Sequence, residues 1–296
     1  MKFLDATTDI AFKKLFGDQK RSSLTISFLN SVLGLKEGSL IATITIMTGE
    51  NVPLTMDGKR SFLDINCIDQ QGRNYIVEVQ KQDEGNFLPR AQFYVGNALA
   101  RQLPQRVDYK DLVPVILVGV VVNFVLFNDF DYLSHHAVAN LKTGKQSHFH
   151  EEYHYLELKK FTKKEHELKT DLEKWAYLLK HAHELDHIPQ EVATSIELQE
   201  ACDVLEHGRW SNQDLAVYRK EQEYLHREGN VEATAEARGE ARGEARGEAR
   251  GREEGEKKKA IDVARNMLAN GIDCGTIVTC TGLTREEVEG MRANAD

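Results

Sequence analysis

The first 125 residues alternate between helical and strand-like patterns of hydrophobic residues. Apolar positions recur at helical spacing from about Thr8 to Leu33, with a glycine break, and a second helix is predicted from about Asn86 to Leu103. The segments Leu40–Thr48 and VPVILVGVVVNFVLF, which begins at Val113, are rich in β-branched residues and predict strands. With a hairpin between Ser61 and Gln82, the order is helix, three strands, helix, strand. This order predicts a mixed α/β core with an antiparallel meander and one crossover strand.

The middle of the chain is mainly helical in pattern. The stretch HFHEEYHYLEL, from His148 to Leu158, alternates like a strand, whereas Asp171–His183 and Gln190–Leu225 have helical spacing. The letters HELDH, at His183–His187, match the H-E-x-x-H pattern of zinc proteases. Because Pro189 limits any helix there and the surroundings are charged, surface histidines are the favoured interpretation.

A tetrapeptide repeat of Glu, Ala, Arg and Gly follows from Ala235. On a helix its period of four would place Glu over Glu and Arg over Arg, and like charges at this spacing oppose an isolated helix. Each glycine weakens such a helix by about 1 kcal/mol relative to alanine. Pairing of the Glu row of one copy with the Arg row of another would relieve the repulsion and form a homodimer. A flexible, solvated spacer is the slightly favoured alternative.

A small helical module is predicted at the end of the chain. Asn270–Gly271 would end one helix, and Thr284 with Glu287 forms a capping box that would begin another. The shape resembles a helix-turn-helix, but its last helix is acidic, so an interaction module is favoured over a reader of bases. The predicted domains are a core at 1–160, a helical extension at 161–229, the repeat at 230–256 and this module at 257–296.

The predicted hairpin SFLDINCIDQQGRNYIVEVQKQ carries one acid in each strand, Asp64 and Glu78. A three-residue loop, Gln70–Gly72, places glycine at the position where such loops favour it, and this register sets Asp64 directly opposite Glu78. Because side chains alternate across a strand, one face of the hairpin is apolar and the other is polar. The apolar face carries Leu63, Ile65, Cys67, Tyr75, Val77 and Val79, and the polar face carries Asp64, Asn66, Glu78 and Gln80.

Two directly opposed carboxylates, with Cβ atoms about 5 Å apart, repel one another. Either one of them takes up a proton or a cation lies between them. Carboxylate oxygens suit Mg²⁺, which can activate water and neutralise charge on a phosphodiester. The alternative is a solvated sheet face whose acids are merely polar, and the residues alone leave both interpretations open.

Composition and charge exclude little. The net charge is −9, but residues 1–125 hold 14 basic and 13 acidic side chains, so the half with the hairpin is near neutral and DNA is not excluded as a partner. Four scattered cysteines argue against a disulfide framework or a cysteine zinc site and favour the reducing cytoplasm. No signal peptide is recognised, and the longest apolar run is too short for a comfortable membrane span.

Several short stretches together carry a family resemblance. They are TTDIAFKKLFG, FLNSVLG, DGKRSFLDI, IVEVQ, RAQFYVGNALARQL, VPVILVGVV and YHYLELKKF, followed by the glycine-every-four tail and its terminal module. Over essentially the whole chain they resemble the Rpn family of recombination-promoting nucleases and transposases, in the PD-(D/E)XK nuclease superfamily. The resemblance implies a restriction-endonuclease-like α/β core of helix, three-strand meander, helix and strand, with a mostly helical C-terminal extension.

The resemblance also implies roles for individual residues. Asp64 followed by Glu78-Val79-Gln80 resembles the D…(D/E)-x-K signature, so Asp64 and Glu78 would be metal ligands, with the Val79 carbonyl as a third. Asp9 matches the place of a further catalytic acid, or else is only a charge that complements a helix dipole. Gln80 stands where lysine is common, and a neutral amide can orient water but supplies no positive charge.

Two groups of residues are predicted to contact DNA. Lys59 or Arg60, just before the first hairpin strand, could replace the missing positive charge. The helix after the Glu78 strand carries a polar stripe with two guanidinium groups, which pair well with phosphate, although a solvated helix face is the alternative. The stripe consists of Arg90, Tyr94, Asn97 and Arg101.

Together these patterns and the resemblance predict a Mg²⁺-dependent DNA endonuclease of the cytoplasm, with Mn²⁺ or Ca²⁺ as other suitable cations. It would hydrolyse phosphodiester bonds in DNA recombination or transposition. The alternative, motivated by Gln80 and the acidic C-terminal half, is a catalytically weak or inactive nucleic-acid-binding protein on a nuclease scaffold. A third hypothesis gives the tail a regulatory role.

Overall fold

The computed structural model describes residues 2–47, 50–51, 61–102, 108–128, 131–146 and 148–293. The chain divides into two compact units, Met1–Glu223 and Tyr224–Asp296. The first unit contains a mixed sheet with helices on both faces, and the second is helical.

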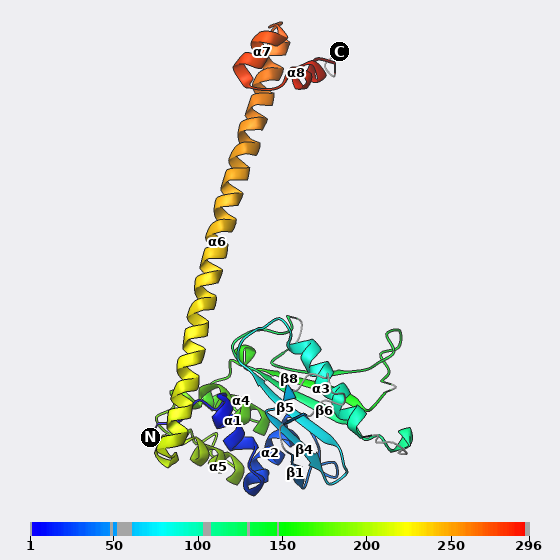
Figure 1. The fold of residues 1–296 in the computed structure, drawn as a ribbon, viewed down its shortest axis with the longest axis vertical. Coiled ribbons are helices and arrows are strands. Elements are labelled where there is room, and N and C mark those ends of the chain that lie inside the picture. The colour runs from blue at the N-terminus through cyan, green and yellow to red at the C-terminus, as the bar shows by residue number, and fades with distance from the viewer. Residues whose placement is uncertain are drawn as a thin grey trace. The chain divides into compact units, whose positions relative to one another are not determined.

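A six-stranded sheet runs through the first unit in the order β1-β4-β5-β6-β8-β7 (Figure 1). Strand β4 is antiparallel to β1 and β5, strands β5, β6 and β8 are parallel, and β7 is antiparallel to β8. The strands are β1 (Ile44–Ile46), β4 (Ile65–Asp69), β5 (Asn74–Gln80), β6 (Val115–Val121), β7 (Leu133–Ala137) and β8 (Glu151–Glu157). A separate short pair is formed by β2 (Glu50–Asn51) and β3 (Ser61–Phe62).

Helices cover both faces of this sheet because both faces are apolar. Ile76 and Leu117 pack with helix α3 (Phe87–Arg101) in one cluster, whereas Val77 and Val118 belong to the larger cluster on the other face. The larger cluster includes residues of α1 (Asp9–Phe16), α2 (Ser22–Val32), α4 (Asp171–His181) and α5 (Ile196–Leu205). The predicted fold, a nuclease-like α/β core of helix, three-strand meander, helix and crossover strand, is confirmed.

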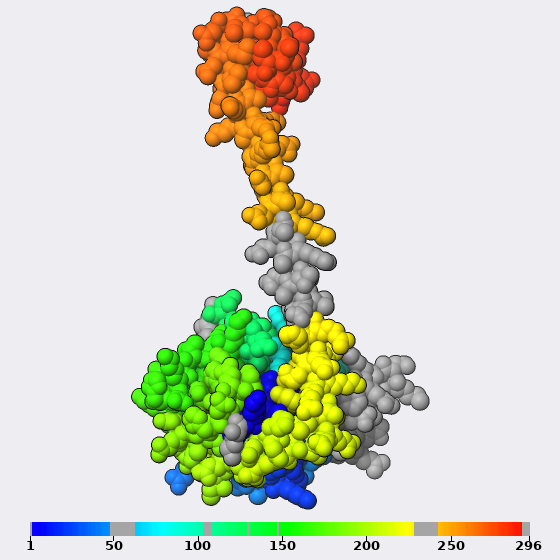
Figure 2. Space-filling model, turned by 90° about the vertical axis from the view of Figure 1, so that its left-hand side faces the viewer, coloured from blue at the N-terminus to red at the C-terminus, as the bar shows by residue number. Residues whose placement is uncertain are grey.

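Helices after residue 160 share the core of the N-terminal helices. The Trp175 ring of α4 lies 5.6 Å from Phe16 and 5.9 Å from Phe28, measured between ring centroids. Its indole N–H donates to Ser27 Oγ at 3.1 Å, which satisfies the one polar group of this buried side chain. Figure 2 shows N-terminal residues (dark blue) between the green surface of these later helices and the yellow first turns of α6.

The helix predicted over Thr8–Leu33 is divided at the expected glycine. The Gly17 N–H bonds to the Lys13 carbonyl at 2.8 Å and ends α1, and a 3₁₀ turn at Gln19–Arg21 leads into α2. A Cβ at Gly17 would lie 2.7 Å from that carbonyl oxygen, so a side chain is not tolerated without movement.

The hairpin of β4 and β5 has the predicted register. Ile65 pairs with Val77 and Ile68 with Asn74, and this alignment places Asp64 opposite Glu78. Gly72 has a φ of +82°, in the left-handed region that favours glycine. The three-residue loop is therefore confirmed.

Some details differ from the sequence prediction. The first hairpin strand is not continuous from Phe62 to Ile68, because the chain bends at Asp64 between β3 and β4. Alternation breaks at this bend, so Leu63, predicted on the face of Ile65, packs instead in the α3 cluster with Ile76. The polar face of the hairpin is covered by α3 rather than solvated. Strand β7 was not predicted, and β1 is shorter than the predicted Leu40–Thr48.

The second unit is built around the end of one long helix. α6 (Asn212–Ala269) includes the tetrapeptide repeat, and α7 (Cys274–Thr281) and α8 (Arg285–Ala293) follow it. Near the end of the repeat, residues four apart carry opposite charges, and Arg250 pairs with Glu254 at 3.0 Å and Arg252 with Glu256 at 3.2 Å. The three helices share a small cluster of Ala264, Ile277, Leu283 and Val288.

Within the described residues, no helix is both long enough and apolar enough to cross a membrane.

Candidate active site

The hairpin acids Asp64 and Glu78 hold one another through the main chain. The Val79 N–H donates to Asp64 Oδ2 at 2.9 Å, and the Asp64 N–H donates to Glu78 Oε1 at 3.2 Å. Glu78 is only 5% exposed. Beside it in the sheet stands Gly119, where a Cβ would lie 2.9 Å from the Phe87 ring, so glycine lets α3 pack closely over this position. Glu78 is thus fixed in place under α3, and the partly buried Asp64 is held against β5 by the Val79 N–H.

This arrangement is electrostatically unfavourable without a cation. Burial, together with the Asp64 charge, raises the pKa of Glu78 to about 8. Burial raises the pKa of Asp64 to about 6; the Val79 hydrogen bond opposes this rise and the nearby Asp9 adds to it. Near neutral pH Glu78 therefore favours a proton, or a positive ion that offsets its own charge and that of Asp64. The donor set, buried carboxylate oxygens, fits Mg²⁺ or a similar hard cation.

Helix α1 brings a third acid and a cation to the pair. Asp9 lies close enough to raise the Asp64 pKa, and it forms an ion pair of 2.7 Å with Lys13 one turn later. Lys13 also lowers the pKa of both Asp64 and Glu78 through its charge. The structure thus assembles the predicted acids Asp9, Asp64 and Glu78. Lys13 was not predicted, although its i, i+4 spacing from Asp9 was a signal for it.

Gln80 is held by an arginine rather than facing solvent. It is 7% exposed, its Nε2 donates to the Gln82 carbonyl at 2.7 Å, and its Oε1 accepts from Arg90. Arg90 also pairs with Glu84 at 3.0 Å and lowers the Glu78 pKa through its charge. The next residue, Lys81, pairs with Asp5 at 2.7 Å instead. Arg90 therefore brings positive charge beside Gln80.

The remaining residues predicted to bind DNA do not lie together on one exposed stripe. Tyr94 is buried in the α3 cluster, where Glu78 and Arg90 affect its pKa, whereas Asn97 is half-buried and Arg101 is exposed. Burial is the largest cause that raises the pKa of Tyr94 to about 12. The other two predicted cations, Lys59 and Arg60, lie outside the described residues.

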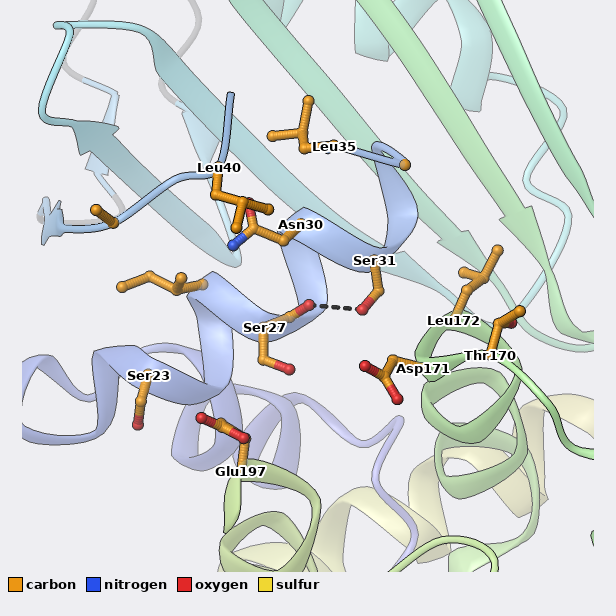
Figure 3. Close-up of a pocket in the computed structure, with 13 residues that line it drawn as sticks. Ser23, Ser27, Asn30, Ser31, Leu35, Leu40, Thr170, Asp171, Leu172 and Glu197 are labelled. Carbon is orange, nitrogen blue, oxygen red and sulfur yellow. Dashed lines mark hydrogen bonds between the residues drawn. The ribbon is translucent and has the colours of Figure 1, made fainter. Parts of the chain in front are cut away.

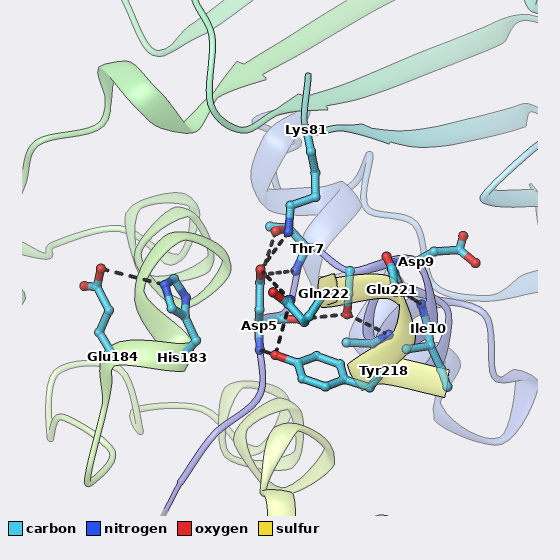
Figure 4. Close-up of polar contacts among 12 residues, drawn as sticks. Asp5, Thr7, Asp9, Ile10, Lys81, His183, Glu184, Tyr218, Glu221 and Gln222 are labelled. Carbon is cyan, nitrogen blue, oxygen red and sulfur yellow. Dashed lines mark hydrogen bonds and ion pairs between the residues drawn. The ribbon is translucent and has the colours of Figure 1, made fainter. Parts of the chain in front are cut away.

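The first turns of α6 attach to the start of α1 (Figure 4). The Glu221 carboxylate accepts from the N–H of Asp9 at 2.5 Å and of Ile10 at 3.4 Å, which caps α1 from a distant part of the chain. Tyr218 Oη accepts from the Asp5 N–H at 3.0 Å, and the Asp5 carboxylate pairs with Lys81 at 2.7 Å. These contacts fix the helix that carries Asp9, and sequence patterns gave no signal for them.

A cavity of about 760 Å³ lies elsewhere, between α2 and the beginnings of α4 and α5 (Figure 3). None of the described residues that line it is Lys or Arg, and it contains the acids Asp171 and Glu197, so its chemistry does not suit a phosphate backbone. Its other polar lining includes Ser23, Ser27, Asn30, Ser31 and Thr170.

The HELDH letters do not form a zinc-protease helix. α4 ends at His181, a 3₁₀ turn covers Ala182–Glu184, and Leu185 is extended. His183 and Glu184 form a 3.8 Å contact, and both side chains are about half exposed (Figure 4). The favoured interpretation, surface histidines, agrees with this geometry.

Comparison with protein families gives two matches along the chain. Residues 6–235 match a family described as PD-(D/E)XK nuclease family transposase. Residues 257–292 match the C-terminal HTH domain of the Rpn/YhgA-like nuclease family. Comparison with curated proteins and with solved structures gave no match.

Proposed function

Because the chain belongs to the PD-(D/E)XK nuclease family of transposases, with the HTH domain of Rpn/YhgA-like nucleases, we propose that it is a metal-dependent DNA endonuclease. The observation that carries the proposal is the buried pair Asp64 and Glu78, held across the hairpin by reciprocal main-chain hydrogen bonds. DNA is the proposed substrate and partner, since the second family match is a helix-turn-helix domain. A role in recombination or transposition and a cytoplasmic location complete the proposal.

In this proposal Asp64 and Glu78 hold the cation, and the Val79 carbonyl completes the set of protein ligands. A bound Mg²⁺ or Mn²⁺ supplies activation of water and neutralises charge on the phosphodiester. Asp9 accepts a proton or orients water at the edge of the pair. Lys13 supplies the positive charge that Gln80 lacks, because its charge already acts on both hairpin acids.

Arg90 has a positioning role. Its guanidinium donates to the Gln80 oxygen and thereby orients the Gln80 amide. The guanidinium also contacts the ring of Phe87, and this contact fixes the plane of the guanidinium. We place Arg101, which is exposed further along the same helix, and Asn97 against the DNA backbone.

The direct test is a plasmid-nicking assay with Mg²⁺ and with Mn²⁺. Asp64→Asn and Glu78→Gln keep the shape of each side chain and remove its charge, so both should abolish nicking. Asp108→Asn is the matched control, because Asp108 is exposed and pairs with Lys110 at 3.2 Å. Undiminished nicking by the Asp64 and Glu78 variants would remove the assignment.

A specific observation favours one second candidate, a DNA-binding protein with little or no cleavage. Arg90 is already engaged by both Gln80 and Glu84, so less of its charge is free for a phosphate. This candidate would be selected if the protein binds Mn²⁺ and binds DNA but does not nick DNA at any concentration of divalent metal.

Self-association through the repeat is a separate proposal. Arg242, Arg246 and Arg250 form one row of like charge on α6, and an oppositely charged row of a second copy would relieve their repulsion. Changing all three to Glu should weaken a dimer in sedimentation experiments, whereas changing all three to Lys should not.

A further inference from the structure

A second polar cluster lies at the other edge of the sheet, on β7 and β8. His135 of β7 is directly opposite His154 of β8 in the antiparallel register. Their imidazole rings are stacked, with centroids 4.2 Å apart and planes at 11°. Two imidazoles are thus presented side by side from neighbouring strands.

A carboxylate completes this cluster. Glu152 precedes His154 by two residues on β8, so both side chains lie on the same sheet face. Glu152 Oε2 lies 3.5 Å from His135 Nε2 and 3.8 Å from His154 Nε2. One nitrogen or oxygen from each of the three residues lies within 4.8 Å of the others. Among the described residues, this is the one grouping of three His, Cys, Asp or Glu side chains with such spacing.

His154 provides an independent sign that the cluster accepts a ligand. The residue is 5% exposed, yet within the described structure its Nε2 makes no hydrogen bond, since Glu152 is beyond hydrogen-bond distance. Buried polar nitrogens are rarely left without a partner. An imidazole nitrogen without a hydrogen-bond partner can offer its lone pair to a metal ion.

The remaining two residues leave the cluster accessible. The His135 side chain is about half exposed and Glu152 is partly exposed, so two of the three ligands face solvent while His154 Nε2 is buried. The three ligand atoms already lie within 4.8 Å of one another, so an ion bound among them requires only small side-chain movements.

We propose that His135, Glu152 and His154 form a binding site for a borderline transition-metal cation of the Zn²⁺ class. Two imidazoles and one carboxylate are ligands that Zn²⁺ accepts in tetrahedral geometry, with the fourth position open to water. Mg²⁺ prefers an all-oxygen set, so this site selects against the cation proposed for the hairpin acids. Bound metal ties the edge strand β7 to β8.

The two sites are separate. Strand β6 lies between β5 and β8 in the sheet. In the aligned register Val77, Val118 and His154 share one sheet face, whereas Glu78 follows Val77 and points to the opposite face. Metal binding at the histidine cluster therefore does not require Asp64 or Glu78.

The test is Zn²⁺ binding by the full chain. Isothermal titration calorimetry measures the binding, and the visible absorption of Co²⁺ bound in place of Zn²⁺ reports on the ligands. The starting protein carries Asp64→Asn and Glu78→Gln to remove the hairpin ligands, and Cys274→Ser and Cys280→Ser to remove the accessible thiols. It should bind one Zn²⁺, gain thermal stability with Zn²⁺ but not with Mg²⁺, and give Co²⁺ absorption typical of nitrogen and oxygen ligands.

His135→Gln should weaken Zn²⁺ binding by more than about tenfold and remove the thermal stabilisation. The matched control is His136→Gln, because His136 is the adjacent residue of β7, faces the other side of the strand and bonds to Ser134 Oγ at 2.9 Å. Since His135 is half exposed, its replacement leaves folding intact, which circular dichroism verifies.

Equal Zn²⁺ affinity in the His135 and His136 variants would overturn the proposal, as would the absence of any Zn²⁺-dependent stabilisation in the starting protein. His154→Gln gives an additional arm in which the buried ligand is lost. If His154→Gln unfolds, the outcome of His135→Gln decides alone.

Discussion

The two polar clusters on this sheet hold their carboxylates in different ways. In the hairpin, Asp64 and Glu78 are fixed by main-chain N–H groups, and no imidazole neighbour shares their charge in the described structure. At the other edge, the single carboxylate of Glu152 lies within 3.8 Å of the Nε2 atoms of two imidazoles. The hairpin therefore concentrates two carboxylates whose repulsion only a proton or a cation relieves, whereas the histidine cluster holds a single carboxylate between two imidazoles. If both proposals hold, the first site should respond to hard cations through charge, and the second should respond to softer cations through ligand type.

The largest effect expected from this contrast is on cleavage. Glu78→Gln should lower the rate of DNA nicking by about a thousandfold or more, because it removes a group on which the whole centre depends. Glu151→Gln should leave the rate within about twofold, since Glu151 is another sheet acid but interacts with Tyr153 at 3.1 Å rather than with the hairpin. Initial rates at saturating Mn²⁺ provide the measurement. Similar rates for the two variants would show that the buried pair is not the centre.

A second effect concerns stability and pH in the absence of metal. The folded-state pKa of Glu78, about 8, lies above its ordinary value of 4.5, so the folded protein binds this proton more tightly than the unfolded chain. The contribution of this proton to the free energy of unfolding should therefore be complete below about pH 4.5. The free energy of unfolding should fall by about 2–4 kcal/mol as the pH rises to 8.

Urea denaturation in EDTA at pH 5 and pH 8 measures this fall. Glu78→Gln should flatten the pH dependence and should be more stable than the unchanged protein at pH 8, although it cannot cleave. Addition of Mg²⁺ should reduce the fall in the unchanged protein. If both proteins lose stability in parallel between these pH values, the charge of Glu78 is not the cause.

A smaller effect tests the cation on α1. Lys13→Met should lower the nicking rate by about ten- to a hundredfold, because a charge that favours ionised Asp64 and Glu78 is removed. Lys14→Met is the matched control: Lys14 is the next residue, but it pairs with Asp214 at 3.1 Å on another side of the helix. Equal rates for the two methionine variants would argue against a role for Lys13.

The smallest effect concerns Gln80. Gln80→Lys restores the residue common in the superfamily, but it places an ammonium beside Arg90, so activity should fall about two- to tenfold. Combining it with Arg90→Met should recover part of the loss. A gain of activity from Gln80→Lys alone would mean that the position lacks positive charge despite Arg90. A double-mutant cycle on the nicking rate separates these outcomes.

The sequence was most informative where structure depends on short-range geometry. The pairing of Asp64 with Glu78 follows from a three-residue turn ending at Gly72, and the register agrees with that argument. The histidine cluster could not be predicted, because it depends on β7 lying beside β8, and strand pairing across a long loop leaves no periodic signal. The positions of Lys13 and Arg90 at the site likewise depend on tertiary packing of α1 and α3. Leu63 was misplaced because a bend at Asp64 ended the alternation from which its face was inferred.

The cap on α1 has a consequence for how the protein is made. Glu221 lies 212 residues after Asp9, so the N-terminus of α1 cannot receive this cap until most of the chain has left the ribosome. Contacts between residues so far apart in sequence form late, because the entropic cost of closing the long intervening loop must be met before the contact stabilises the chain. The helix that carries Asp9 is therefore completed only after the sheet with Asp64 and Glu78 has been synthesised. Until residue 221 has emerged, α1 has only its local cap, the Thr8 side chain, and lacks the contact that ties its first turn to α6.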